Sequence, residues 1–459
     1  MCIRDSTYGG QNCRAMSIVQ LLLGNIGVPG GGLNAMRGEP NVQGATDVAC
    51  TVPDLPGYLK WPTAKKHRHL ADYLHAETYA DGYYSNKPKF MVSFLKEFFG
   101  ENATVENDYG YEMLPKIGPR LPASAWTTMG TFHMMRDGRI KGYFAWGMNP
   151  AHSTPNAKFA RNAMANLDWL VCADWFPTET ATFWKAPDMD PAKIQTEVYF
   201  LPAALIYEKI GSISNSGRWV QWRQQGVLPP GEAKSDFEII EVLFDRIRSL
   251  YQKEGGVYPD PILKANMDYK VDGKYDLRAV CWAINGYTVQ DGKLLPGYAQ
   301  LQADGSTACG MWIYSGYYNN EADKLDPMKQ PTARRSKEDP SGMGLFSGWS
   351  FAWPANRRVL YNRASCDMKG RPWNPEKVFV EWKGDKWLQY DVGDFVTANP
   401  PDNKAFFMTW EQNARLFSYA MADGPMPEHY EPFESPTKNL LNDSVQAPCA
   451  PVSYTHLTL

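Results

Sequence analysis

The chain has 459 residues, a formal net charge of -3 and a hydrophobic content of 44%. This balance shows no basic excess of the kind that nucleic-acid binding requires, and no apolar run reaches the roughly 18 residues that a membrane-spanning helix needs. The 16 Trp and 34 Pro residues favour a large, irregular and aromatic-packed structure over an idealised helical bundle.

The first predicted element is a helix over residues 11–23, "QNCRAMSIVQLLL", whose apolar residues recur at helical spacing. Gly24 is well placed as the residue just beyond the helix end. A long glycine-rich loop, "GVPGGGLNAMRGEPNVQGATD" (27–47), follows. Loops of this length inside a domain are usually functional or disordered, and the low charge of this one argues against disorder.

The middle of the chain predicts a parallel sheet. Strand, helix and strand follow one another as a βαβ unit, which implies parallel strands joined by a right-handed crossover. After about residue 255 the sequence becomes rich in Trp, Gly and Pro, with few long periodic segments. The predicted elements in chain order are short helices at 92–99 and near 126–136, a strand at the start of 140–150, a helix at 156–167, strands at 168–176 and 196–203, and an amphipathic helix at 236–252.

The eight cysteines are dispersed, and no two lie within four residues of each other. This spacing predicts neither a zinc ribbon nor a cluster site confined to the chain, and a disulfide framework is unsupported at this length. We expect core or surface thiols. The end sequences "MCIRDS" and "VSYTHLTL" fit no element, so we expect non-native tails on an internal piece of a longer protein.

Polar residues follow both strands of the βαβ unit. Gly147 and Asn149 come after the first strand, and Asp174, Thr178 and Thr180 come after the second. Ligands of open α/β sheets bind beyond the carboxyl ends of the strands. The amide of Asn149 and the hydroxyls of Ser153, Thr178 and Thr180 are suited to phosphate or sugar oxygens. The carboxylate of Asp174 is suited to the N–H groups of guanine. The alternative is an ordinary Gly-Asn-Pro turn.

The loop segment "RGEPNVQG" (37–44) carries a different chemistry. Arg37 is a permanent cation with a planar fork that suits a carboxylate. Gly38 and Gly44 permit backbone shapes that expose N–H groups, and Asn41 and Gln43 add amide donors. Such a loop could hold phosphates, pterin edges or a small acid. The alternative is a structural turn in which Arg37 pairs with Glu39 or Asp47.

Five ordered blocks resemble the molybdopterin-dependent formate dehydrogenases of the dimethyl-sulfoxide-reductase superfamily. "GGLNAMRGEPNVQGATD" resembles their active-site loop, and "YFAWGMNP" with "LVCADWFPTETATFWKAP" resembles their second dinucleotide-binding segment. "TEVYFLPAALIYEKIGSISNSGRWVQWR" is similar to the next signature. "GMWIYSGYY" and "FAWPANRRVLYNRASCDMKGRPWNPEK" are similar to a segment of the large (alpha) subunit of the formate dehydrogenase-N and -O type. The likeness runs from about residue 8 to 447.

This resemblance implies an α/β molybdopterin oxidoreductase fold with βαβ, Rossmann-like parallel-sheet domains, without the family's N-terminal iron-sulfur domain and C-terminal β-barrel domain. The implied division is a non-native tail (1–6), the end of a cofactor-binding α/β domain with the active-site loop (7–44), a second α/β domain that binds molybdopterin guanine dinucleotide (45–205), a connecting and Trp-rich formate-dehydrogenase-specific region (206–447) and a second tail (448–459).

The resemblance also implies the chemistry. In this family a Mo or W ion is held by two molybdopterin guanine dinucleotides, formate is oxidised to carbon dioxide, and electrons pass through a [4Fe-4S] cluster to an iron-sulfur beta subunit. A membrane haem b gamma subunit is a further implied partner, and the implied location is the periplasm, with the cytoplasm as the alternative. The metal's Sec or Cys ligand and the cluster cysteines belong to the absent N-terminal half, so this chain alone is expected to be inactive.

The resemblance assigns roles to particular side chains. Arg37 would bind the formate carboxylate, and Asp174 would read guanine. The other implied cofactor contacts are Gly38, Gln43 and Gly44 at the pterin, and Gly147, Asn149, Ser153 and Thr180 in the second dinucleotide-binding segment. No residue of this chain is expected to bind the metal itself.

Two other classes remain open. One is another molybdopterin oxidoreductase, either a nitrate reductase or an NAD-linked soluble formate dehydrogenase. The other is a non-catalytic relative such as the large iron-sulfur subunit of respiratory complex I. The presence of Arg37 with "NVQG", together with the Trp-rich segment, favours a formate dehydrogenase catalytic subunit.

Overall fold

A computed structural model gives the fold of the chain. It describes residues 9–25, 32–33, 41–50, 54–80, 83–118, 127–215, 219–317, 349–351 and, between 366 and 389, all but 368, 377 and 379. None of the helices in these ranges is both long enough and apolar enough to cross a membrane. Arg37, Gly38, both expected tails and most of the Trp-rich segment lie outside the described residues.

Three parallel strands form the sheet that the sequence predicts. They are β3 (Gly142–Trp146), β4 (Trp169–Asp174) and β5 (Glu197–Pro202), in the order β3-β4-β5. The register pairs Gly142 with Trp169, and Trp169 with Glu197. Helices α7 (Pro150–Ser153) and α8 (Ala157–Met164) make the crossover between β3 and β4. The βαβ unit and the third strand are therefore confirmed, and with them the α/β class.

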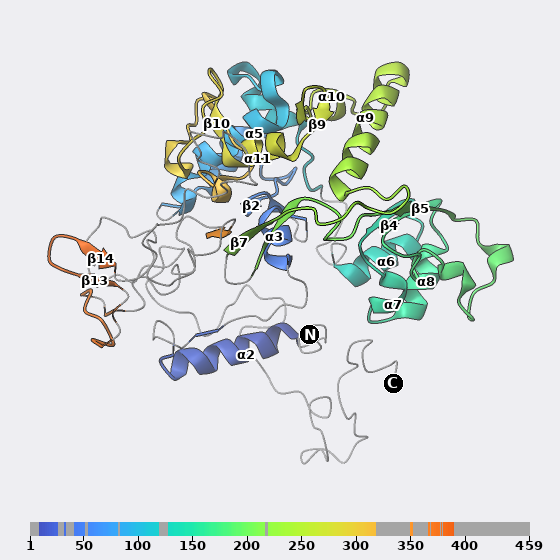
Figure 1. Ribbon diagram of the computed structural model, residues 1–459, viewed down its shortest axis with the longest axis horizontal. Coiled ribbons are helices and arrows are strands. Elements are labelled where there is room, and N and C mark those ends of the chain that lie inside the picture. Colours follow the sequence, from blue (N-terminus) through green and yellow to red (C-terminus); the bar gives the residue numbers. More distant parts are fainter. Residues whose placement is uncertain are drawn as a thin grey trace, which may run out of the picture.

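One face of this sheet is covered by α8 and by α6 (Thr128–Arg136), as Figure 1 shows. Helix α8 turns Ala160, Ala163 and Met164 inward, and all three are fully buried. Two alanines allow the helix to approach the sheet closely, where it meets the buried Leu170 and Cys172. This cluster, the sheet core, fixes the two strand ends at which the predicted site residues lie.

A second cluster, the tryptophan core, is built around Trp312. Its ring stacks on Phe90 at a centroid distance of 4.2 Å, and its Nε1 donates to the Gly57 carbonyl at 2.8 Å. Gly57 has φ +75°, and a Cβ there would lie 2.5 Å from the Trp312 ring, so only glycine fits. Phe90 comes from α5 (Lys87–Phe99), which carries a proline in its first turn.

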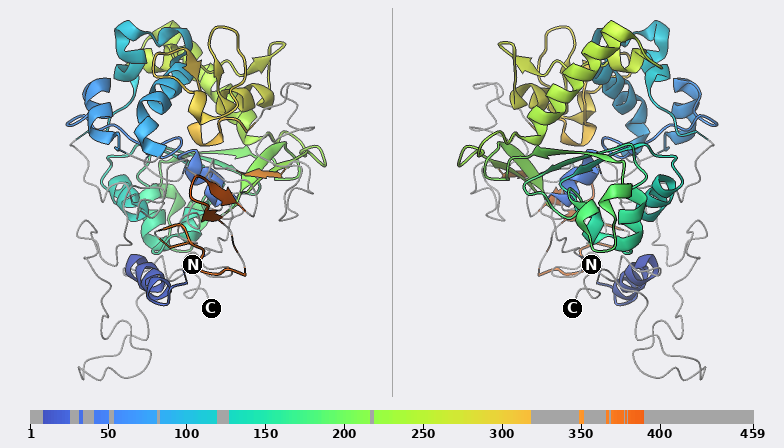
Figure 2. Two further views of the ribbon diagram at one scale, coloured as in Figure 1. Left: turned by 90° about the vertical axis from the view of Figure 1, so that its left-hand side faces the viewer. Right: turned by 90° about the vertical axis from the view of Figure 1, so that its right-hand side faces the viewer.

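The tryptophan core joins residues 55–114 to residues 281–317, whereas the sheet core contains residues 132–183. The predicted domain 45–205 therefore contributes to both clusters. The domain boundaries themselves stay predictions. Figure 2 shows α2 (Gly9–Leu22), in dark blue, below the other helices. This helix confirms the one predicted at 11–23, and Gly24 follows it with φ +67°.

The predicted loop 27–47 is wrong at its end, because residues Val42–Asp47 form helix α3. Asn41 precedes this helix and accepts, through Oδ1, the backbone N–H of Ser214 at 3.0 Å on β6 (Gly211–Ser214). A Cβ on Gly44 would lie 2.2 Å from that same Oδ1. Glycine is a poor helix former, so these tertiary contacts, which composition does not reveal, stabilise the helix.

The remaining elements are mostly short. The helices are α4 (Leu70–Glu77), η1 (Tyr83–Asn86), η2 (Gly100–Asn102), η3 (Val105–Met113), η5 (Phe183–Lys185), η6 (Pro191–Lys193), α9 (Asp236–Glu254), α10 (Asp260–Leu263), α11 (Leu277–Asn285), η7 (Tyr298–Gln300) and η8 (Trp312–Tyr314). The strands are β1 (Asp54–Leu55), β2 (Leu59–Lys60), β7 (Trp219–Arg223), β8 (Lys270–Val271), β9 (Lys274–Tyr275), β10 (Tyr287–Thr288), β11 (Thr307–Ala308), β12 (Trp349–Phe351), β13 (Val380–Trp382) and β14 (Trp387–Gln389).

Helix α9 confirms the amphipathic helix predicted at 236–252. Its start is fixed by a capping box, in which Ser235 Oγ accepts the Glu238 N–H at 3.3 Å and Glu238 Oε2 accepts the Ser235 N–H at 2.9 Å. Gly255 ends the helix with φ +72°. The helix also buries Glu241, whose side chain is 2% exposed and whose Oε2 takes no hydrogen bond among the described residues.

Glu241 is expected to weaken the fold as pH rises. Burial, reinforced by the carboxylate of Asp245, raises the pKa of Glu241 to about 7. The unfolded chain therefore releases this proton at a lower pH than the folded chain, so the free energy of unfolding falls as pH rises from about 4.5 to about 7 and stays lower above that. We expect Glu241→Gln to raise the free energy of unfolding at pH 8 by about 1–2 kcal/mol, with little change at pH 5.

Thermal unfolding at the two pH values measures this effect. Glu254→Gln, at the exposed end of the same helix, is the matched control and should change neither value. An equal gain from Glu241→Gln at both pH values would show that the raised pKa is not its cause.

Candidate functional site

The two strand ends of the sheet carry the predicted site residues on the loops that follow them. Parallel strands present their carboxyl ends at one edge, so the loop after β3 and the loop after β4 meet there. Gly147 follows β3, and its N–H donates to the Ala173 carbonyl of β4 at 2.8 Å. Gly147 is therefore held beside Asp174, the last residue of β4.

Asn149 and Thr180 are brought together across these two loops. The Oδ1 atom of Asn149 accepts both the backbone N–H of Thr180 at 3.1 Å and its hydroxyl at 2.8 Å. The Nδ2 atom of Asn149 donates to Glu179 Oε2 at 2.5 Å, and this hydrogen bond lowers the pKa of Glu179. The Thr180 hydroxyl also accepts the Ala151 N–H at 3.0 Å. The pair locks one loop to the other.

This bonding gives Thr180 a positioning role. Its side chain is 1% exposed, and its hydroxyl is engaged by Asn149 and Ala151. These contacts favour a structural role for that hydroxyl, and its direct contact with a phosphate stays a prediction. Ser153 ends α7 and donates its N–H to the Asn149 carbonyl at 2.9 Å, and its half-buried side chain stays nearer the surface.

Gly147 and Asp174 present the accessible chemistry of this edge. Gly147 has φ +58°, and a Cβ there would meet nothing within 4 Å, so its backbone is open to a ligand while its conformation favours glycine. One carboxylate oxygen of Asp174 accepts the Trp175 N–H at 2.7 Å. The other takes no hydrogen bond among the described residues, and it remains available to an N–H donor.

Two aromatic residues that the sequence reading passed over stand beside Asp174. Trp175 is 51% exposed and Phe176 is 67% exposed. Large apolar rings left exposed next to a carboxylate are suited to a planar base, which stacks on a ring and donates N–H groups to the acid. The predicted strand at 168–176 included both residues, whereas β4 ends at Asp174, so the sequence pattern did not mark them as part of the following loop. An open backbone, an available carboxylate and exposed rings together fit a guanine nucleotide.

The predicted pterin residues Gln43 and Gly44 lie on α3, which packs on β6. Gln43 is 5% exposed and donates through Nε2 to Asp47 Oδ1 at 2.8 Å and to the Tyr58 hydroxyl at 3.2 Å. The carboxylate of Asp47 is fully buried. Gly44 accommodates the side chain of Asn41. Both residues thus shape the helix that directly follows residues 37–40, and their contact with a pterin stays a prediction.

Comparison with known proteins gives a consistent picture. The family model described as Molybdopterin oxidoreductase matches residues 1–246. The nitrate-inducible formate dehydrogenase major subunit of Escherichia coli is 42% identical in an alignment that covers 94% of this chain and 43% of that protein. The formate dehydrogenase 2 subunit alpha (cytochrome c-553) of Nitratidesulfovibrio vulgaris is 43% identical, over 94% of this chain and 43% of its own length.

A nitrate reductase is a more distant relative. The assimilatory nitrate reductase catalytic subunit of Bacillus subtilis is 29% identical over 52% of this chain and 26% of its own length. The formate dehydrogenase subunits therefore match nearly twice as much of the chain, at higher identity. The chain spans less than half the length of the relatives that it matches.

Proposed function

The chain belongs to the molybdopterin oxidoreductase family, and from this membership we propose that it forms part of the catalytic subunit of a formate dehydrogenase. The observation that carries the proposal is the 42–43% identity to formate dehydrogenase subunits over 94% of the chain. The match to these subunits extends well beyond the match to the family model, which ends at residue 246 of this chain. The proposed reaction is the oxidation of formate to carbon dioxide, with electrons passed to an iron-sulfur subunit.

Family membership implies a molybdopterin cofactor with Mo or W, and we propose its bis-guanine-dinucleotide form. When bound, this cofactor supplies the two-electron redox chemistry that no amino-acid side chain offers. Asp174 would accept the N–H groups of guanine, and the open backbone at Gly147 would let the nucleotide approach. Asn149 and Thr180 would hold the two loops in register, with Ser153 at the rim. A [4Fe-4S] cluster, bound by residues outside this chain, would conduct the electrons away.

The proposed substrate contact is Arg37. Its guanidinium would bind the formate carboxylate through two parallel hydrogen bonds and orient the C–H bond toward the cofactor. Gly38 directly follows Arg37 in the sequence, and α3 begins at Val42. Gln43 and Gly44 would line the pterin from that helix. Asn41, the first described residue after Arg37, anchors the start of α3 to Ser214 of β6.

The proposed partners follow from the same relatives. Their names describe a major subunit and a subunit alpha, which are parts of assemblies. We propose an iron-sulfur beta subunit as the direct electron acceptor, with a membrane haem b gamma subunit as a further partner. The proposed location is the periplasm, and a cytoplasmic enzyme is the alternative.

The competing functions have weaker support. The relative that is a nitrate reductase matches 52% of the chain. A non-catalytic relative of the complex I type needs neither a substrate cation at position 37 nor a guanine site, and the accessible Asp174 with its exposed aromatic neighbours supports the proposal of such a site. An NAD-linked soluble formate dehydrogenase would differ from the proposed enzyme in its electron acceptor, whereas the proposed role of Arg37 in binding formate would be the same.

The intact subunit that contains this chain tests the substrate assignment. Purified from cells supplied with molybdate or tungstate, it should reduce benzyl viologen with formate. It should not oxidise reduced viologen with nitrate. Nitrate-dependent oxidation without formate-dependent reduction would replace the proposed function with that of a nitrate reductase.

A further inference from the structure

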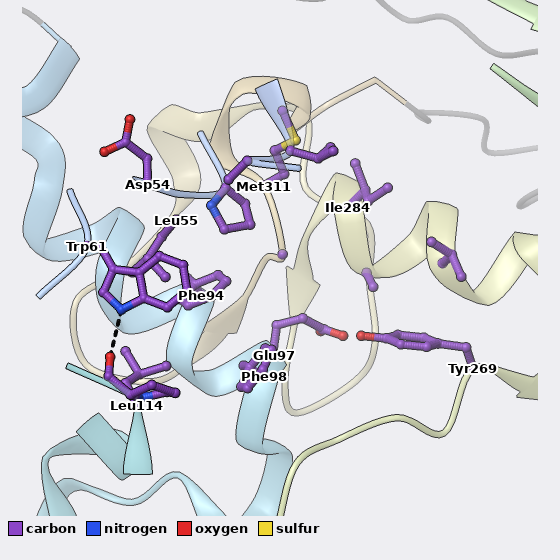
Figure 3. A pocket seen from close by; sticks show the side chains of 17 residues that line it. Asp54, Leu55, Trp61, Phe94, Glu97, Phe98, Leu114, Tyr269, Ile284 and Met311 are labelled. Carbon is purple, nitrogen blue, oxygen red and sulfur yellow. Dashed lines mark hydrogen bonds between the residues drawn. The ribbon is translucent and has the colours of Figure 1, made fainter. Parts of the chain in front are cut away.

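A cavity of about 490 Å³ opens between α5 and α11 (Figure 3). It lies within the size range of sites for small organic molecules. Helix α5 directs Phe94, Glu97 and Phe98 toward it, because residues three and four apart share one helical face. Val280 and Ile284 of α11 form the opposite wall. None of these residues belongs to the proposed formate site.

The described residues that line the cavity are apolar or aromatic, apart from the two acids Asp54 and Glu97, and they include no Lys, Arg or His. Trp61 donates its indole N–H to the Pro115 carbonyl at 2.7 Å. The polar edge of this ring is thereby occupied, while the ring still lines the cavity. Aromatic faces and acids without a basic residue favour a ligand that carries positive charge.

Glu97 is the chemical centre of this cavity. The residue is 4% exposed, and its Oε2 atom takes no hydrogen bond among the described residues. Figure 3 shows its carboxyl group and the Tyr269 hydroxyl pointing toward each other. Burial raises the pKa of Glu97, and the hydroxyl groups of Tyr287 and Tyr269 beside it oppose that rise. A ligand that donates a hydrogen bond to Oε2 would satisfy this buried acceptor.

We propose that this cavity binds a small lipophilic amine, with the ammonium group donating to Glu97 Oε2 and the apolar body lying between α5 and α11. Trp61 and Phe94 would contact the ligand through their rings, and the ring of Tyr269 would flank the ammonium. The carboxylate of Asp54 adds negative charge at the cavity wall. This inference does not rest on the proposed formate chemistry, because it uses neither Arg37 nor the sheet edge.

Three probes that share an indole ring and differ in the head group test the proposal on the full chain. Tryptamine carries an ammonium group, tryptophol a hydroxyl and indole-3-propionate a carboxylate. We expect titration calorimetry and ligand-observed NMR to rank tryptamine first and to show no binding of the carboxylate. Glu97→Gln keeps the shape of the side chain and removes its charge, so it should weaken tryptamine binding by at least about tenfold while leaving tryptophol unchanged.

Two further variants separate the cavity from a general surface effect. Glu101→Gln removes an exposed acid one turn along the chain and should leave tryptamine binding as in the wild type. Val280→Trp fills the cavity from α11 and should abolish binding of both tryptamine and tryptophol in a chain with an unchanged circular dichroism spectrum. Equal binding of the three probes, tryptamine binding that survives Glu97→Gln, or no binding of any probe at millimolar concentration would each overturn the proposal.

Discussion

Replacing Arg37 by alanine in the intact enzyme is expected to lower kcat/KM for formate by about 10³-fold or more, with molybdenum and pterin contents unchanged. A guanidinium both neutralises the formate anion and orients it through a fork of two N–H donors. Alanine removes both contributions, and no compensating charge arises at that position. Steady-state assays with a viologen acceptor measure the kinetic loss, and elemental analysis measures the cofactor content.

Arg37→Lys separates charge from orientation. Lysine keeps the positive charge and loses the planar fork, so its kcat/KM should lie between those of the wild type and the alanine variant. Arg68→Ala removes an exposed arginine near the tryptophan core and is the matched control, with expected wild-type kinetics. Unchanged kinetics in Arg37→Ala would reject the assigned role.

Replacing Asp47 by alanine is expected to destabilise the chain by about 3–5 kcal/mol. The Asp47 carboxylate is fully buried and accepts from Gln43 at 2.8 Å, from the Tyr58 hydroxyl at 2.7 Å and from the Tyr314 hydroxyl at 3.1 Å. Alanine would leave these three donors without this acceptor. It would also release α3 from the η8 segment that carries Tyr314.

The midpoint of urea unfolding, followed by tryptophan fluorescence, measures this loss. Tyr314→Phe removes one of the three donors and keeps the acceptor, so its cost should be smaller, at about 1 kcal/mol. Asp137→Ala removes a half-exposed aspartate and should change stability by less than about 0.5 kcal/mol. A midpoint for Asp47→Ala equal to that of Asp137→Ala would show that the buried network does not support the fold.

The parallel sheet could be predicted because its signals are local. Apolar runs at the start of 140–150 and in 168–176 marked the two strands, and the helix between them showed its own periodicity. The amphipathic pattern of residues 236–252 likewise marked α9 within two residues. These features depend on neighbours in the sequence, and therefore a single sequence contains them.

The rest depended on contacts between distant segments. Helix α3 contains a glycine and forms because Asn41 reaches Ser214, 173 positions along the chain. The tryptophan core joins Gly57 to Trp312 across 255 positions. A basic run such as residues 65–69 is typical of a solvated surface, yet His67 is 1% exposed and its Nε2 atom lies 3.3 Å from Glu77 Oε1. No local pattern encodes such pairings.

The same distinction applies to the candidate site. Sequence reasoning placed Asn149 and Thr180 correctly after their strands, and it assigned both to the ligand. The hydrogen bonds between them show how polar residues at a strand end can serve the loops themselves. Spacing alone could not distinguish these roles, because a side chain's partner is decided by the fold. Asp174, which keeps an available oxygen, is the better-supported contact.

A guanine-nucleotide site at the ends of β3 and β4 is tested most directly by measuring GMP and metal in acid extracts of the purified intact enzyme and its Asp174→Ala variant. The wild type should release one guanine nucleotide for each pterin, and Asp174→Ala should retain less of both nucleotide and metal. Asp168→Ala, an exposed position just before the other end of β4, should match the wild type. Full nucleotide and metal occupancy in Asp174→Ala would contradict the site.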